Sequence, residues 1–338
     1  MKKSNKRNSR LKYLIILLLL TAIIFGSSTY AWFTTNKTVT VSSIDINVQA
    51  VDGIQISVDG INWKSTITKA ELLAATTTYS AAPNKIPEQL EPVSTALTYD
   101  GTTGLLNMYY GDVKANETTG NYELYSVKNA NTDEKVHYIV FDVFLKTTTN
   151  IPNLYLTTDS GASYVGTSVG LENATRIAMI KQGNTTAGAS TSTIQGLVTS
   201  SASDAYLWEP NYKSHTAASV SNAAAMYGIN TSTNPANNEL IPYSGINAVI
   251  PTVDGEGTPV AGIPLADCTE TDNADYFLDV VPTYTTETGF ASNLKVFGLS
   301  AGITKLRVYM WIEGQDIDCE NNASGTDVQF DLKFTIDE

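Results

Sequence analysis

Hydrophobic and polar residues alternate along several stretches of the chain, and this pattern predicts β-strands. The clearest stretches are residues 305–313 and 328–336, in which every second residue is apolar. The apolar positions are Leu306, Val308, Met310 and Ile312 in the first stretch, and Val328, Phe330, Leu332, Phe334 and Ile336 in the second. We expect two half-buried strands, joined by residues 314–327 into a long hairpin.

A similar alternation follows residues 39–50, but its phase changes once. The first phase holds Val39 and Val41, and the second holds Ile44, Ile46, Val48 and Ala50. Because a shift of one residue turns the opposite face of a strand to the core, the slip at Ser42 and Ser43 predicts a β-bulge or a strand break. The pairs Asp52-Gly53 and Asp59-Gly60 suit type I′ hairpin turns, so we expect a β-meander to follow.

Other stretches extend this β-rich pattern. Residues 136–145 are apolar on both phases, which predicts a strand covered on both faces, with 154–156 as a plausible partner strand. Residues 105–110, 122–127 and 174–180 are also typical of strands. The clearest helix spans 68–75, where Thr68 and Glu71 have the spacing of a capping box.

Residues 183–262 differ from the rest in composition. They are rich in Ser, Thr, Gly, Ala and Asn, and they contain few apolar anchors. We interpret them as a loop-rich insertion and not as a separate enzyme domain. The sequence therefore predicts an all-β chain with one or two short helices, in one domain over residues 32–338.

The first 31 residues have the order of a secretory signal peptide. A head with six basic residues precedes an apolar core over 14–25 and a short, mostly small and polar segment. This order predicts export and cleavage by a signal peptidase between Ala31 and Trp32. The alternative is an uncleaved anchor, in which residues 13–33 are the only contact with a membrane.

The charge of the chain restricts the classes of partner that it can bind. The net charge is −13, and removal of the basic head leaves 15 Lys and Arg against 34 Asp and Glu, a net charge of −19. This charge argues against nucleic acid and anionic membrane surfaces as partners. It fits a secreted, extracellular protein, either one that is only kept soluble by self-repulsion or one that binds cations.

Two motifs of catalysis are absent from the sequence. The only two histidines, His137 and His215, are too far apart for a His-Glu-x-x-His zinc motif, and no phosphate-binding glycine loop occurs. We therefore expect a non-enzyme with no catalytic residues. We assign His137 a structural role in a strand, and we expect His215 to be solvated in a polar loop.

The acidic segment around Cys319 is the best candidate for a binding site. Asp316, Asp318 and Glu320 supply hard oxygen ligands, so calcium is a possible cofactor, although acidic loops are usually only solvated. The second cysteine, Cys268, also lies in acidic, loop-like sequence. An oxidising exterior allows a Cys268–Cys319 disulfide, and the alternative is two unpaired buried thiols.

The signal junction resembles the TasA/camelysin family of exported Gram-positive proteins. The resemblance rests on the basic head, the apolar core, the residues Tyr30-Ala31-Trp32-Phe33 and the alternating strand Thr40 to Ala50. It covers about the first 60 residues, with weaker motifs at 174–180, 208–211 and 311–319. It implies a SipW-type signal peptide, a jelly-roll-like antiparallel β-sandwich, and assembly of biofilm-matrix fibres by donation of the N-terminal strand.

The sequence and this resemblance together favour a secreted, non-catalytic cell-surface or biofilm-matrix protein. The partners would then be further copies of the chain or related matrix proteins. The expected assembly strand contains Trp32, Phe33, Val39, Val41, Ile44, Ile46 and Val48. The same residues would also serve as an ordinary first strand of their own sandwich.

Two other functions remain open at this point. One is a monomeric adhesin or ligand-binding module that uses the 183–262 loops, with Trp208, Tyr212, Tyr227 and Tyr243 as aromatic contacts. The other is a metallopeptidase, because camelysin members are described as metalloproteases. The sequence offers no recognisable zinc-ligand set, so that activity is not carried over.

Overall fold

The structure is a computed structural model of the chain. It describes residues 39–48, 54–116, 118–129, 137–166, 168, 170–217, 219–221, 243–251, 263–264, 275–287, 289–319 and 327–336. Strands in several sheets dominate, with only short helices. The predicted all-β fold class is confirmed.

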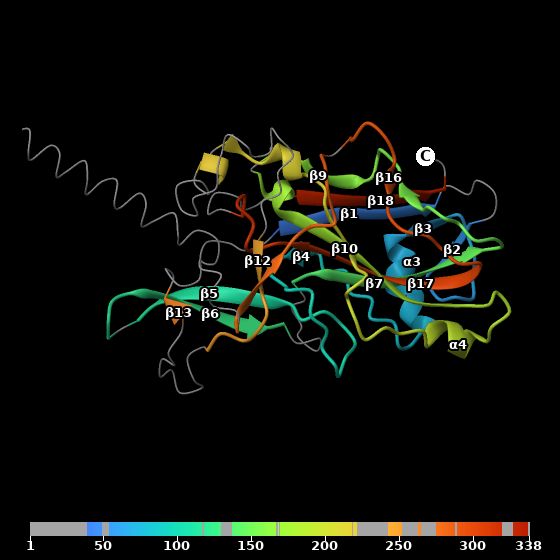
Figure 1. Cartoon of the computed structure of the whole chain (residues 1–338), viewed down its shortest axis with the longest axis horizontal. Coiled ribbons are helices and arrows are strands. Elements are labelled where there is room, and N and C mark those ends of the chain that lie inside the picture. The colour runs from blue at the N-terminus through green and yellow to red at the C-terminus, as the bar shows by residue number, and fades with distance from the viewer. Residues whose placement is uncertain are drawn as a thin grey trace, which may run out of the picture.

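Two sheets form the body of the protein (Figure 1). Sheet 1 contains, in spatial order, β16 (Leu294–Lys295), β8 (Tyr155–Leu156), β18 (Asp327–Thr335), β1 (Val39–Val48) and β3 (Thr66–Thr68); β4 (Gln89–Leu90) also pairs with β1, and β9 (Gly161–Val165) with β18. Sheet 2 contains β15 (Tyr284–Thr285), β11 (Tyr206–Glu209), β10 (Thr175–Thr185), β17 (Gly302–Ile312), β7 (Ile139–Thr147) and β2 (Gln55–Ser57).

Smaller elements lie outside the two sheets. One small sheet pairs β12 (Tyr243–Ile246) with β14 (Phe277–Val280), and another contains β13 (Ile263–Pro264), β6 (Tyr122–Lys128) and β5 (Tyr109–Ala115). Short helices among the described residues include α3 (Lys69–Ala74) and α4 (Thr191–Gln195), with 3-10 turns η1 (Ala75–Thr77), η2 (Leu171–Ala174) and η3 (Tyr212–Ser214). The paired strands β5 and β6 extend away from the two-sheet body (Figure 1).

Each of the two sheets combines early and late strands of the chain. In sheet 2 the late strand β17 lies between β7 and β10, and in sheet 1 the last strand β18 lies between β1 and the pair β8 and β9. Most strand pairs are antiparallel, as expected, but β1 pairs with β18, and β11 with β15, in parallel.

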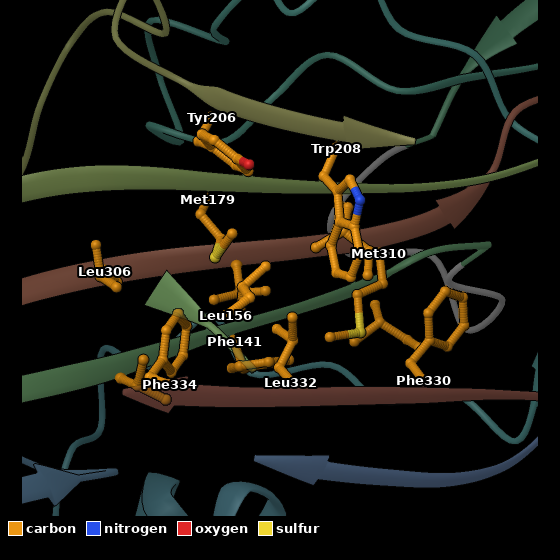
Figure 2. Close-up of a cluster of buried hydrophobic side chains, with 14 of the residues drawn as sticks. Phe141, Leu156, Met179, Tyr206, Trp208, Leu306, Met310, Phe330, Leu332 and Phe334 are labelled. Atoms are coloured by element: carbon orange, nitrogen blue, oxygen red, sulfur yellow. The ribbon is translucent and has the colours of Figure 1, made fainter. Parts of the chain in front are cut away.

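The main hydrophobic core fills the space between the two sheets. Figure 2 shows side chains from β10, β11, β17 and β7 on one side meeting those of β18 on the other. On β18 every second residue is buried, so the predicted half-buried alternation of this strand is confirmed. Full burial of a large apolar side chain contributes roughly 1.5–3 kcal/mol, so this layer is the main source of stability.

Sheet 2 is covered on its outer face as well. A second apolar cluster lies there, formed by residues of β7, β10, β11 and β17 with residues 93–108 and β14; its buried members are Val93, Leu105, Leu106, Met108, Tyr138, Val140, Ala178, Ile180, Leu207, Val280, Tyr309 and Trp311. The prediction that 136–145 is covered on both faces is therefore confirmed. The prediction of a half-buried strand at 305–313 is wrong, because every residue of β17 is buried.

Three sequence-based pairings are also wrong. β17 and β18 do not form a hairpin, because the chain crosses from sheet 2 to sheet 1 between them. β1 and β2 do not start a meander, since they lie in different sheets. β8 pairs with β18 and β16, and not with β7. Periodicity identifies a strand and its buried face, but it does not identify the sheet to which the strand belongs.

Several local predictions are confirmed. The register between β1 and β18 shifts between Val41 and Ile44, which is the position of the expected bulge. α3 begins after Thr68 with the expected capping box, in which Thr68 and Glu71 bond each other's backbone N–H groups. The type I′ turn expected at Asp59-Gly60 is wrong, although the chain reverses there and Ile56 bridges Lys64 in antiparallel fashion: Gly60 has a positive φ of +72°, but Asp59 does not.

Candidate functional site

Strand β1 occupies an inner position in sheet 1. It pairs over seven residues with β18 on one side and over shorter stretches with β3 and β4 on the other. The register places Ile44, Ile46 and Val48 beside Phe330, Leu332 and Phe334. These three β18 residues are fully buried in the main core, so β1 completes the sheet above it.

A second candidate site lies where three strands of sheet 2 end. Arg176 is at the start of β10, Glu209 is the last residue of β11, and the turn after β17 carries Asp316 and Asp318. His215 follows η3. We call these five residues the Arg176 cluster. The exposed fraction of each of their side chains is 2% or less.

Arg176 links two of the carboxylates. Its Nη2 lies 2.8 Å from Glu209 Oε1 and donates to Asp316 Oδ2 at 2.5 Å. Its Nη1 donates to the carbonyl oxygen of Thr175 at 3.0 Å. The guanidinium therefore holds the end of β11 to the turn after β17.

His215 is held by the third carboxylate. Its Nδ1 lies 2.6 Å from Asp318 Oδ2, and its Nε2 lies 3.4 Å from Glu209 Oε1. Asp318 Oδ1 also accepts from the backbone N–H of Thr216 at 3.1 Å and from the Thr216 hydroxyl at 2.9 Å. Asn173 donates to the carbonyl oxygen of Ser214 at 2.8 Å, which fixes the backbone just before His215.

Burial and charge act in opposite directions on this histidine. Burial alone lowers the pKa of His215, but the charge of Asp316 and the hydrogen bonds with Asp318 and Glu209 together raise this pKa to about 10. Burial raises the pKa of Asp316 against the opposing charges of Arg176 and His215. The pKa of Asp318 is lowered, because its bonds to His215 and Thr216 outweigh burial.

One oxygen of the cluster has no hydrogen-bond partner among the described residues. It is Glu209 Oε2, which is buried with the rest of its side chain. Glu209, His215 and Asp316 each offer one ligand atom, and these atoms lie within 4.8 Å of one another. The described residues thus contain one carboxylate–histidine set able to hold a metal ion.

A separate buried ion cluster lies on the outer face of sheet 2. Asp142 of β7 accepts from Arg307 Nε at 2.7 Å, from Arg307 Nη2 at 3.0 Å and from the Tyr79 hydroxyl at 2.9 Å. Lys305 Nζ lies 3.3 Å from Asp142 Oδ2 and donates to the carbonyl oxygens of Gln195 and Leu197. We call Asp142, Arg307, Lys305 and Tyr79 the Asp142 cluster.

The structure brings together part of the predicted calcium site. Asp316 and Asp318 are adjacent, with the backbone N–H of Asp318 donating to Asp316 Oδ1 at 2.8 Å, and both side chains are buried and not solvated. Glu320 lies outside the described residues. The expectation for His215 is wrong, because the ion pairs with Asp318 and Glu209 hold it inside the protein. His137 is buried, stacks on Tyr110 and lies 3.0 Å from Glu91.

Other predicted residues are placed only in part. Residues 1–38, which include the signal peptide, the cleavage site Ala31–Trp32 and Phe33, lie outside the described residues, and so do Cys268 and Tyr227. Cys319 is buried in the main core. The expected Cys268–Cys319 disulfide is not tested, because Cys268 lies outside the described residues. Within 183–262, Trp208 and Tyr212 are fully buried and cannot contact a ligand at the surface, while Tyr243 lies in β12.

Sequence reasoning missed Glu209, His215 and the Asp142 cluster. The available signal was a charged residue inside an apolar strand: Asp142 interrupts residues 136–145, and Glu209 follows Leu207 and Trp208. Charged residues are rarely fully buried unless they are paired, so each such position predicts a partner from elsewhere in the chain. The sequence does not say which residue that partner is.

No described helix is long and apolar enough to cross a membrane. Comparison of the chain with protein-family models, curated proteins and solved structures found no match.

Proposed function

We propose that this chain is an exported, non-catalytic structural protein of a cell surface or biofilm matrix, and that its copies assemble by exchanging strand β1. The observation that supports this proposal is the place of β1 inside sheet 1, between β18 and the strands β3 and β4. β1 is the first described strand, and it joins the rest of the described fold at one end only, through residues 49–53. It can therefore leave its sheet while the other described strands keep their connections along the chain.

The position of β1 in sheet 1, between β18 on one side and β3 and β4 on the other, is suited to a strand from another copy. We call this position the slot of β1. Without β1, β18 exposes one backbone edge, and β3 and β4 expose another, so an incoming strand satisfies both edges. The slot also demands an apolar residue at alternate positions, next to the buried Phe330, Leu332 and Phe334. Residues 44–48 meet this demand, so the same strand of a second copy fits in the same register.

The leader-like first 31 residues and the strongly acidic remainder support the extracellular part of the proposal. The adhesin alternative is less well supported than strand exchange, because Trp208 and Tyr212 are core residues.

The test uses cysteines on neighbouring strands. Asn47 of β1 lies opposite Thr66 of β3, and directly paired residues of antiparallel strands are close enough for a disulfide. One preparation of the full exported chain carries Asn47→Cys and another carries Thr66→Cys. After mixing and assembly, we expect disulfide-linked pairs of the two variants in fibres seen by electron microscopy, because β1 of one copy then pairs with β3 of the next.

Two controls make the test decisive. Asn47→Cys mixed with Thr77→Cys places the second cysteine at an exposed site away from β1, and no specific cross-link is expected. A single chain with both Asn47→Cys and Thr66→Cys locks β1 in its own sheet, and it should form fibres only after reduction. Fibres from the oxidised, locked chain at the rate of the unsubstituted chain would refute strand exchange.

A further inference from the structure

The Arg176 cluster has the chemistry of a metal site. We propose that Glu209, His215 and Asp316 bind one divalent transition-metal ion of the zinc or manganese class. The three ligand atoms lie within 4.8 Å of one another in the buried ends of β11 and β17. The proposal is independent of the exchange of β1, which lies in sheet 1.

An unpartnered oxygen points to a ligand in this cluster. Glu209 is 1% exposed, its Oε1 is held by Arg176, and its Oε2 has no hydrogen-bond partner among the described residues. Burial of an unsatisfied carboxylate oxygen carries a desolvation cost that no hydrogen bond offsets. A metal ion bound at this oxygen removes that cost.

The histidine is oriented as a metal ligand. Its Nδ1 is 2.6 Å from Asp318 Oδ2, so a proton on Nδ1 leaves the lone pair of Nε2 facing Glu209 Oε1 at 3.4 Å. A cation between these two atoms, either a proton on Nε2 or a metal ion, removes their repulsion. A carboxylate that holds the second ring nitrogen of a ligating histidine is a recurrent feature of metal sites.

The charge of the cluster also fits a divalent ion. Three carboxylates face one guanidinium, which leaves an excess of two negative charges when His215 is neutral. A buried excess of this size is costly unless a cation compensates it. One divalent ion bound in place of the His215 proton compensates this excess.

The donor set selects the class of metal. One imidazole nitrogen with two carboxylates suits zinc, manganese or iron(II). Calcium needs six to eight oxygen ligands, and the cluster offers fewer. The sequence-based expectation of calcium at Asp316 and Asp318 is therefore replaced here by a different ion, with Asp318 as the residue that positions His215.

The experiment measures binding to the full exported chain after treatment with a chelator. Zn²⁺, Mn²⁺ and Ca²⁺ are added separately, and bound metal is counted after dialysis. We expect one equivalent of Zn²⁺ or Mn²⁺, a rise of several degrees in Tm and no comparable rise with Ca²⁺. With Co²⁺ as a probe, the unsubstituted chain should show absorption typical of nitrogen and oxygen ligands, which requires no variant to fold.

Variants locate the site. Glu209→Gln and His215→Asn should abolish binding, and Asp318→Asn should weaken it about 10–100-fold. His137→Asn, which changes the other buried histidine, should bind as the unsubstituted chain does. Less than a tenth of an equivalent of each transition metal, or unchanged binding by folded Glu209→Gln, would overturn the proposal. So would Ca²⁺ binding that His215→Asn leaves intact. None of these outcomes bears on the cross-linking of β1 and β3.

Discussion

The two buried ion clusters of sheet 2 differ in how completely their charges are paired. In the Asp142 cluster one carboxylate meets two cations and a phenol, and both of its oxygens accept hydrogen bonds. In the Arg176 cluster three carboxylates meet one arginine and one histidine, and Glu209 Oε2 stays unpartnered among the described residues. The first cluster is complete by itself, whereas in the second one carboxylate oxygen lacks a partner among the described residues, and the proposed metal ion would supply it. Pairing, and not burial alone, thus distinguishes a structural cluster from a candidate site.

The largest effect is expected from Asp142→Asn. This change leaves Arg307 and Lys305 buried without their counter-ion, and removal of one partner of a buried ion pair typically costs about 3–5 kcal/mol. The free energy of unfolding, measured with urea, should fall by this amount. A loss below about 1 kcal/mol would mean that the carbonyl oxygens of Gln195, Leu197 and Gly104 are sufficient partners for the two cations.

The next largest effect concerns the buried carboxyl group of Glu313. Burial raises the pKa of Glu313 to about 7, although Trp311 Nε1 and the backbone N–H of Gln315 donate to it and Arg176 lies near. Its ordinary pKa is about 4.5, so the unfolded chain ionises first as the pH rises. The free energy of unfolding should therefore decrease between pH 4.5 and 7, by about 3 kcal/mol at most.

The variant Glu313→Gln should remove this part of the pH dependence. Urea unfolding of both proteins at pH 5 and pH 8, with a chelator present, gives the comparison. We expect the unsubstituted chain to lose more stability than the variant on going to pH 8. Equal losses would mean that Glu313 is ionised in the fold at both pH values.

Removal of metal ions with a chelator should affect the Arg176 cluster and not the Asp142 cluster. If the free metal ion is present at a hundred times its Kd, its removal lowers the free energy of unfolding by about 2.7 kcal/mol. This loss corresponds to a fall in Tm of several degrees. The unsubstituted chain and Asp142→Asn should both show this fall, and His215→Asn should not. A fall of equal size in His215→Asn would show that the chelated ion binds elsewhere.

A contrast between local and long-range interactions explains which features the sequence could predict. The bulge at Ser42 and Ser43, the capping box of Thr68 and the strand over 136–145 depend on neighbours in sequence, and all three are confirmed. The burial of β17 on both faces depends on residues 93–108, which lie about 200 positions earlier in the chain. The alternating polar residues of β17 therefore predicted a solvent-exposed face, but another segment of the chain covers that face.

The candidate site was predictable only in part for the same reason. Asp316 and Asp318 are close in sequence, and their acidic spacing singled them out. Their partners come from β10, β11 and the turn after η3, between about 100 and 140 positions away. Only the pairing of β17 with β10 brings Arg176 to these carboxylates, and no local pattern encodes that pairing.

The smallest effect is expected at the surface. Lys333 Nζ lies 2.7 Å from Asp159 Oδ2, the same distance that separates Arg307 Nε from Asp142 Oδ1. The Asp159 side chain is 61% exposed, so water already solvates both charges and salt screens their attraction. Asp159→Asn should therefore change the free energy of unfolding by less than about 1 kcal/mol, and the change should shrink further in 0.5 M salt. A loss as large as that of Asp142→Asn would mean that distance, and not burial, determines the strength of ion pairs in this fold.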